Sequence, residues 1–319
     1  MNYYITNMFN IKITLPFFCL YFFSCVYFNT FYNAENSFNK ANEIIDESSY
    51  NYDSSDIPTS AKKLLNESIS SSSLVISNYP ESKYVDDAIY YMARSYFSLS
   101  EFYKSQKYFN ELVNNYPNSK HYNESRLWLE YSHLKLNILD SLFINISNIE
   151  NELISTQKKT AKEPLFLLYN LKGDFFIETN EFEKGFDAFD KALNFVESKS
   201  KKTMLYSKLA YISESNNMLE KSAEYLDKVQ IFSNNSETKI EAFRKWLEVM
   251  KKLKKYDQVI LKIEDKINSS EFETEKLRDE FNMELAIVYM DNKEFIKSKN
   301  LFNDIINNSS QKKIKCESY

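Results

Sequence analysis

Two closely similar stretches decide the fold of this chain: Asn78-Tyr79-Pro80-Glu81-Ser82-Lys83 and Asn115-Tyr116-Pro117-Asn118-Ser119-Lys120. The second begins 37 residues after the first. A recurrence at a fixed spacing of roughly 20 to 50 residues indicates a solenoid, in which each repeat packs on its neighbours. Proline ends the preceding helix because it has no amide hydrogen, and we expect the serine that follows to cap the next helix.

A grid of small and aromatic residues follows the same period. Where two antiparallel helices cross at short range, a small residue lets their backbones approach and large residues fill the space beside the crossing. The small positions of the first helices are Ala93, Gly173, Ala210 and Ala286, and those of the second helices are Ser105, Gly185, Ser222 and Ser298. The aromatic positions are Tyr96, Phe176 and Tyr289 in first helices and Phe109, Phe189 and Phe302 in second helices.

The composition favours helices over strands. The 319 residues include only 2 glycines and 5 prolines, so the chain lacks the residues that hairpin turns between strands require. Short turns rich in Asn, Asp and Glu separate the segments that have helical periodicity, as at 178–181 and 291–294. We therefore predict an all-α fold.

This grid resembles the tetratricopeptide repeat, which has a period of about 34 residues and a small-aromatic pattern that ends in proline. The resemblance covers about residues 30 to 308 and implies a right-handed α-solenoid of stacked helix pairs, about six or seven in number. It is strongest at 81–117, 166–200 and 279–308. Two repeats depart from it. The repeat at 122–155 has Glu130 and His133 at the positions of Ala93 and Tyr96, and the repeat around 240–268 has Leu247 at the small position. We expect both to be distorted.

The start of the chain has the pattern of a bacterial lipoprotein signal. Residues 1–12 are polar with one lysine, residues 13–23 are apolar, and Ser24-Cys25 follows directly. A small residue before a cysteine at this place predicts cleavage after residue 24 and lipidation of Cys25. The alternative is an uncleaved anchor over 13–28, although its 16 residues are fewer than the roughly 20 that span a bilayer.

The remainder of the chain divides into three parts. Residues 25–60 are predicted to hold an N-terminal helix and a loop, followed by repeats at 61–160 and at 161–319. Phe31, Ala34, Phe38 and Ala41 have the spacing of a second repeat helix. Trp128 and Trp246 are expected to pack between repeats.

Catalytic chemistry is not predicted. His121 and His133 are the only histidines, and neither forms a metal-binding or nucleophilic motif with the 3 cysteines. A Gly-rich phosphate loop is impossible with 2 glycines. Without residues 1–24, which hold one lysine and no acids, the net charge is −6, and this argues against a nucleic-acid partner. We expect no cofactor and no metal, and an enzyme is the least favoured class.

Function is therefore expected to depend on a surface. The inner wall of such a solenoid is lined by first helices and holds peptides or partner domains. The resemblance implies that the family's inward positions fall, in the best-formed repeat, at Asp87, Tyr90, Arg94 and Phe97, whose two aromatic rings, cation and acid suit a protein groove. The alternative is that Tyr90 and Phe97 are buried against the next repeat.

Lipidation at Cys25, followed at once by repeats with Tyr-Pro-x-Ser-Lys turns, resembles the BamD-like outer-membrane lipoproteins. That resemblance implies a lipid-anchored scaffold on the periplasmic face of the outer membrane, which serves β-barrel assembly and contacts the barrel insertase. The runner-up is a periplasmic adaptor for envelope or peptidoglycan machinery.

Overall fold

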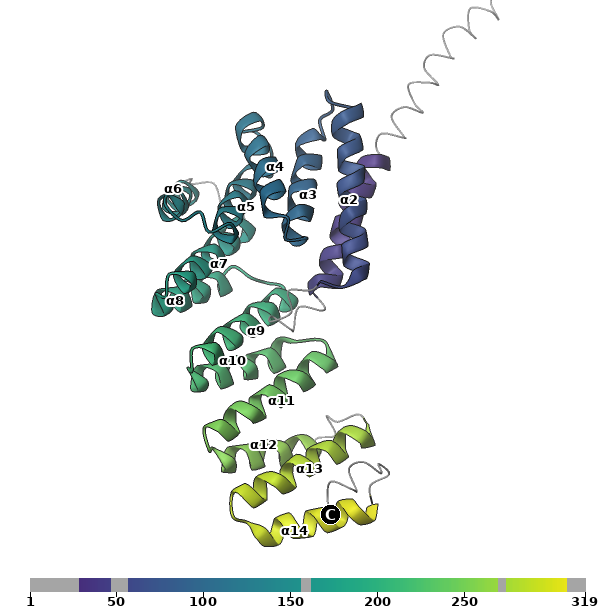
Figure 1. The fold of residues 1–319 in the computed structure, drawn as a ribbon, viewed down its shortest axis with the longest axis vertical. Helices are drawn as coiled ribbons and strands as arrows, with labels where there is room; N and C mark the ends of the chain where they lie inside the picture. Colours follow the sequence, from purple (N-terminus) through teal and green to yellow (C-terminus); the bar gives the residue numbers. More distant parts are fainter. Residues whose placement is uncertain (1–28, 47–56, 156–161, 269–273, 309–319) are drawn as a thin grey trace, which may run out of the picture. The chain divides into compact units, whose positions relative to one another are not determined.

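The computed structural model describes residues 29–46, 57–155, 162–268 and 274–308 (Figure 1). These residues form fourteen helices and no strand, which confirms the predicted all-α solenoid of helix pairs. None of the described helices is both long enough and apolar enough to span a membrane. The predicted signal at 1–24, the alternative anchor at 13–28 and Cys25 lie outside the described residues.

The fourteen helices form seven consecutive hairpins in the described ranges. The first hairpin pairs the helix 29–46 with α2 (Thr59–Asn78). The next three are α3 (Val85–Ser98) with α4 (Phe102–Asn115), α5 (Tyr122–Lys135) with α6 (Leu142–Ser155), and α7 (Lys162–Glu178) with α8 (Phe182–Leu193). The last three are α9 (Lys199–Ser215) with α10 (Leu219–Phe232), α11 (Ser236–Lys252) with α12 (Tyr256–Asn268), and α13 (Glu275–Asp291) with α14 (Phe295–Asn308).

The chain divides into two compact units, and the boundary between them in the sequence falls within α9, between Leu205 and Tyr206. We call them unit 1 and unit 2. Within each unit, consecutive helices pack on one another, α2 on α3 and α4 on α5 in unit 1, and α10 on α11 and α12 on α13 in unit 2. The boundary expected between residues 160 and 161 falls outside the described residues.

The N-terminal helix 29–46 is the first helix of its hairpin. The prediction from its spacing, that it is a second helix, is wrong. The helix after it, α2, ends at the first Asn-Tyr-Pro turn, just as α4 ends at the second. Both kinds of helix bury small and aromatic residues at similar spacing, so that spacing alone does not distinguish them. Phe31, Ala34, Phe38 and Ala41 are all buried, as expected of a core-facing stripe.

The two Asn-Tyr-Pro turns have the same hydrogen bonds. The amide of Tyr79 donates to the carbonyl of Val75 (3.0 Å), and that of Tyr116 donates to Leu112 (2.9 Å). The predicted capping by serine is wrong in detail, because Tyr84, rather than Ser82, is the N-cap residue of α3. The hydroxyl of Ser82 instead accepts from the amide of Tyr84 (3.0 Å), which makes a serine turn one step before the helix.

The turn inside each later hairpin repeats one backbone geometry. The C′ residue has a positive φ in all six hairpins from α3/α4 onward: Ser100, Asn137, Asn180, Asn217, Lys254 and Lys293. In the α7/α8 turn, the amide of Asn180 donates to Ile177 (3.0 Å) and that of Glu181 to Phe176 (2.8 Å). This is a Schellman motif, which satisfies the last carbonyls of the first helix and reverses the chain.

The small positions lie at the helix crossings as predicted. A methyl group built at Gly185 would stand 3.4 Å from the carbonyl oxygen of Gly173 on the partner helix. In two other hairpins the small residue of the second helix is a serine, which donates to the carbonyl of the small residue twelve positions earlier. Ser222 donates to Ala210 (3.0 Å) and Ser298 to Ala286 (2.8 Å). Small side chains thus fix the close approach of paired helices.

The hairpins predicted to be distorted are packed less closely. α5 with α6, and α11 with α12, approach each other less than α7 with α8. In the α5/α6 hairpin the two small positions are occupied by Glu130 and Leu142, both buried. In the α11/α12 hairpin they are occupied by Leu247 and Val259, also buried. A large side chain at the crossing keeps the second helix away from the first.

Trp128 packs between successive repeats, as expected, and Trp246 is buried within its own hairpin. In unit 1, Trp128 on α5 contacts Phe97 on α3, with ring centroids 4.8 Å apart. In unit 2, Trp246 on α11 is buried beside Phe243, and Phe243 contacts Phe281 on α13 at 5.1 Å. These aromatic contacts join first helices of successive hairpins, and they form much of the core between repeats.

Candidate functional site

The four residues predicted to face the groove lie on α3 and come together where α3 meets α5. Asp87 and Tyr90 are buried, whereas Arg94 and Phe97 are half-buried. Their spacing of three, four and three residues places them on one face of the helix. That face contacts α5 and the turn before it. Binding of a partner by these side chains stays a prediction, and their contacts within the chain decide which of their atoms are accessible.

Asp87 is held by the second Asn-Tyr-Pro turn. Its Oδ1 is 2.8 Å from Nζ of Lys120 and 2.9 Å from Nε2 of His121. Burial raises the pKa of the Asp87 carboxyl, but the hydrogen bonds from His121 and Lys120 outweigh burial, so its pKa lies below the ordinary value. Asp87 is therefore ionised at neutral pH and fixes the start of α5.

Tyr90 joins the same cluster. Its hydroxyl donates to Oε2 of Glu124 (2.5 Å), and its ring stacks on the imidazole of His121 with centroids 3.9 Å apart. The neighbouring Tyr91 donates to Oε1 of Glu35 (2.7 Å) on the helix 29–46. Burial and the adjacent carboxylates raise the pKa of both phenols. Both phenols stay protonated and act as hydrogen-bond donors that join α3 to its two neighbours.

Arg94 lies over an aromatic surface. Its guanidinium carbon is 3.7 Å from the ring centroid of Trp128 and 5.4 Å from that of Phe38, and its Nη1 donates to the hydroxyl of Tyr90 (3.3 Å). Phe97 packs edge-on against Trp128. Arginine stacked on tryptophan gains cation–π energy and stays charged. Tyr90 and Phe97 are thus packed against the next repeat, the arrangement expected of the alternative reading.

The contacts continue through α5 to α7. The hydroxyl of Tyr131 donates to Oδ2 of Asp174 (2.9 Å) and accepts from Nδ2 of Asn170 (2.6 Å). A continuous set of aromatic and charged side chains therefore follows the first helices of unit 1. We call this set the first-helix band. It consists of Glu35, Phe38, Asp87, Tyr90, Tyr91, Arg94, Phe97, His121, Glu124, Trp128, Tyr131, Asn170 and Asp174.

Several band residues were not predicted as groove residues, although the sequence contains a signal for them. Asp87 contacts His121 and Tyr90 contacts Glu124, and both pairs are 34 residues apart. That separation is the repeat of 37 residues less three, which is about one helical turn. A residue on one first helix therefore contacts the residue 34 positions later, which lies one helical turn before the equivalent position of the next repeat. Adding 34 to a groove position predicts its partner.

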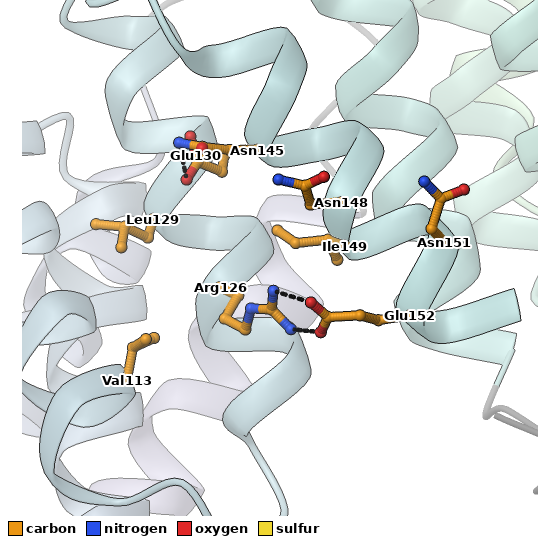
Figure 2. Close-up of a pocket in the computed structure, with 9 residues that line it drawn as sticks. All are labelled: Val113, Arg126, Leu129, Glu130, Asn145, Asn148, Ile149, Asn151 and Glu152. Carbon is orange, nitrogen blue, oxygen red and sulfur yellow. Dashed lines mark hydrogen bonds and ion pairs between the residues drawn. The ribbon is translucent and has the colours of Figure 1, made fainter. Parts of the chain in front are cut away.

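A pocket lies on another part of unit 1, among α4, α5 and α6 (Figure 2). Its volume is about 500 Å³. Figure 2 shows Arg126 and Glu152 facing each other in a bidentate ion pair, and Glu130 joined to Asn145. The lining residues are Val113, Arg126, Leu129, Glu130, Asn145, Asn148, Ile149, Asn151 and Glu152. The pocket lies in the hairpin where Glu130 takes the place of a small residue.

Both histidines are engaged by neighbouring side chains. His121 is occupied by Asp87 and Tyr90, and His133 contacts Glu130 through Nδ1 at 3.1 Å. In the part of the chain that the structure describes, no group of three His, Cys, Asp or Glu side chains could hold a metal ion. Neither the first-helix band nor the pocket combines a nucleophile with a base.

Comparison with known proteins identifies part of this region. Residues 87–119 match the family model described as tetratricopeptide repeat. The matched segment contains all four predicted groove residues and the whole of α4. The hairpin α3/α4 is therefore similar to a tetratricopeptide repeat. No curated protein sequence matches the chain.

Two solved structures are similar to the chain at low identity. One is a tetratricopeptide repeat protein from Parabacteroides merdae, with 11% identity and a TM-score of 0.39, for which the alignment covers 90% of this chain and 97% of the other. The other is the APC/C hetero-tetramer Cut9-Hcn1, with 12% identity and a TM-score of 0.43. That alignment covers 92% of this chain and 54% of the other.

Proposed function

We propose that this tetratricopeptide-repeat chain is a scaffold that binds other proteins through the first-helix band. We further propose that Cys25 is lipidated and anchors the chain at the periplasmic face of the outer membrane, where it serves β-barrel assembly and contacts the barrel insertase. The observation that carries the scaffold role is that the partly exposed residues Arg94, Phe97 and Trp128 of the band place a cation beside two aromatic rings on neighbouring first helices.

Tyr, Trp and Arg are the residue types that dominate binding energy at protein interfaces. The band holds them in fixed conformations, since each phenol and the guanidinium is hydrogen-bonded or stacked. Binding to such a surface costs less side-chain entropy than binding to a surface whose side chains must first be ordered. Lys120 lies beside the band, and its side chain is 64% exposed although it pairs with Asp87.

Unit 2 offers a different first-helix surface. There α11 and α13 are joined by ion pairs, Arg244 with Glu280 (2.8 Å) and Lys251 with Glu284 (2.9 Å). Partly exposed ion pairs contribute little binding energy, and the aromatic rings of α11 and α13, Phe243, Trp246 and Phe281, are buried. We therefore assign the main binding surface to unit 1.

The anchor is tested by metabolic labelling. The chain is expressed in a Gram-negative host with a clickable fatty acid, and wild type is compared with Cys25→Ala in fractionated membranes. We expect label on the wild type in the outer-membrane fraction and none on the variant. An unlabelled wild type that remains in the inner membrane would instead support the uncleaved anchor at 13–28.

The scaffold role is tested by co-purification after mild cross-linking. We expect the barrel insertase with the wild type and its loss with Arg94→Ala, which removes the cation stacked on Trp128. Tyr103→Ala is the matched control, since Tyr103 lies on α4 and is 75% exposed. Equal yields from all three proteins would exclude the band as the binding surface. Recovery of peptidoglycan enzymes in place of the insertase would favour the periplasmic adaptor.

A further inference from the structure

The pocket among α4, α5 and α6 has a chemical character that the first-helix band does not share. Its wall combines three apolar side chains, three asparagines, one arginine and two glutamates, so the lining has a formal charge of −1. The arginine, Arg126, is engaged by both carboxylate oxygens of Glu152. Glu130 is the other carboxylate of the lining, and it does not pair with Arg126 through a hydrogen bond.

Glu130 is nearly enclosed by the chain. Its side chain is 7% exposed, and its two oxygens accept from Nδ2 of Asn145 (3.1 Å) and contact Nδ1 of His133 (3.1 Å). A carboxylate has about four lone-pair sites, so two contacts leave it able to accept further hydrogen bonds. Burying a carboxylate without a full complement of partners is unfavourable. A cationic donor that entered the pocket would add hydrogen bonds to those that Glu130 makes with Asn145 and His133.

The cation that fits is organic. The described residues contain no group of three His, Cys, Asp or Glu side chains that could hold a metal ion. An ammonium or guanidinium group needs only one carboxylate and room for its alkyl stem. Val113, Leu129 and Ile149 supply apolar contact for such a stem.

The asparagines favour a cation carried by a peptide. Asn145, Asn148 and Asn151 recur every three residues along one face of α6 (Figure 2). Asn148 and Asn151 are exposed and have no hydrogen-bond partner among the described residues. A side-chain amide can donate to a backbone carbonyl and accept from a backbone amide at once. Two free amides beside the pocket can therefore pair with an extended peptide.

We propose that this pocket binds a lysine or arginine side chain of an extended peptide segment, with Glu130 as the acceptor for its cation and Asn148 and Asn151 as partners for its backbone. This is a second binding site, separate from the first-helix band. It does not depend on the function proposed above, because none of its residues belongs to the band.

The test is a methyl NMR titration of the full chain labelled at isoleucine δ1 positions, with Ile149→Leu used to assign the signal of Ile149, which lines the pocket. The probes are N-acetyl-Ala-Ala-Lys-Ala-Ala-amide, the same peptide with arginine or norleucine at the centre, and n-butylamine. We expect the lysine and arginine peptides to shift the Ile149 signal with an affinity at least about tenfold above that of the norleucine peptide.

The variants separate the cation from the backbone contacts. Glu130→Gln keeps the shape of the side chain and is expected to abolish the preference for lysine over norleucine. Asn148→Ala changes only an exposed residue and is expected to weaken all peptides without affecting n-butylamine. Glu67→Gln on α2 is the matched control and is expected to bind like the wild type. Thermal unfolding of each variant confirms that the chain is folded.

Two results would overturn the proposal. Equal binding of the lysine and norleucine peptides to the wild type would remove the role of Glu130. Binding of n-butylamine as tightly as the lysine peptide would assign the pocket to small cations rather than to a peptide. A partner that binds only the first-helix band would be retained by Glu130→Gln and lost from Arg94→Ala, so the two proposals fail separately.

Discussion

Two successive hairpins of unit 1 have the same turn and differ at the helix crossing. In α7/α8 the crossing is made by Gly173 and Gly185, and the helices pack closely. In α5/α6 the corresponding residues are Glu130 and Leu142, and the helices pack less closely. The regular hairpin has a closed crossing, whereas the irregular one lines a pocket of about 500 Å³ with α4. In this hairpin, the departure from the repeat pattern coincides with the pocket.

The test with the largest expected effect is Leu142→Ala, which gives the irregular hairpin a small residue at the position where the repeat pattern has one. Leu142 is 1% exposed, so its removal leaves a cavity that α6 cannot fill while Glu130 holds Asn145. We expect a loss of about 2–5 kcal/mol in the free energy of unfolding, measured by urea denaturation. Gly185→Ala at the matching position is the control, expected to change stability by less than about 1 kcal/mol. A stabilised Leu142→Ala variant would mean that the crossing is not packed by Leu142.

The reverse test places a side chain in the closed crossing. A methyl group at Gly173 would lie 2.4 Å from Cε1 of Phe189, whose side chain is fully buried, so the ring must move. We expect Gly173→Ala to cost about 1–3 kcal/mol in spite of the better helix propensity of alanine. At Gly185 the nearest atom is the end of the Ile177 side chain, which is half-buried and flexible. Gly185→Ala should therefore be the milder of the two in the same denaturation series.

The repeat grid, the helices and the places of the short turns between them could be predicted from the sequence because they depend on local patterns. Ala93, Ser105 and Phe109 are buried at the predicted crossing, and Glu130 was identified as a departure. The pocket could not be predicted, since it depends on how far α6 is displaced.

The predicted groove shows the same limit. Asp87 and Tyr90 lie on one face of α3 as their spacing indicated, but their burial depends on the turn at Lys120 and His121. A helical period identifies a face and does not say how much of it the next repeat covers. The place of the helix 29–46 in its hairpin also depends on which helix it pairs with. Its small and aromatic residues do not specify that partner.

A third test asks what holds α5 in place when its own partner helix packs loosely. Asp87 on α3 binds Lys120 and His121 at the start of α5, and its pKa is below the ordinary value. A depressed pKa means that the native state favours the ionised form, so this stability is present above about pH 4 and is lost as the pH falls further. We expect Asp87→Asn to cost about 1–2 kcal/mol at pH 7.

The measurement is thermal unfolding of wild type and variant between pH 7 and pH 2. The difference between the two proteins should shrink as the pH falls below about 4, because the wild-type carboxyl is then protonated. Asp86→Asn, one residue earlier in the same helical turn, is the control for removing a carboxylate from the first turn of α3. A difference between wild type and Asp87→Asn that is independent of pH would show that the charge of Asp87 does not contribute.

The smallest test asks whether the turns contribute to the difference between the two hairpins. Asn137 in the irregular hairpin and Asn180 in the regular one have φ values of 58° and 60°, and both make the same backbone hydrogen bonds. Alanine is disfavoured in this left-handed conformation, so Asn137→Ala and Asn180→Ala should each cost about 1 kcal/mol. If the crossing alone distinguishes the hairpins, the two losses will agree in urea denaturation. A much smaller loss at Asn137 would show that the irregular hairpin has a strained turn as well as an open crossing, and Glu130 and Leu142 would then explain only part of the displacement of α6.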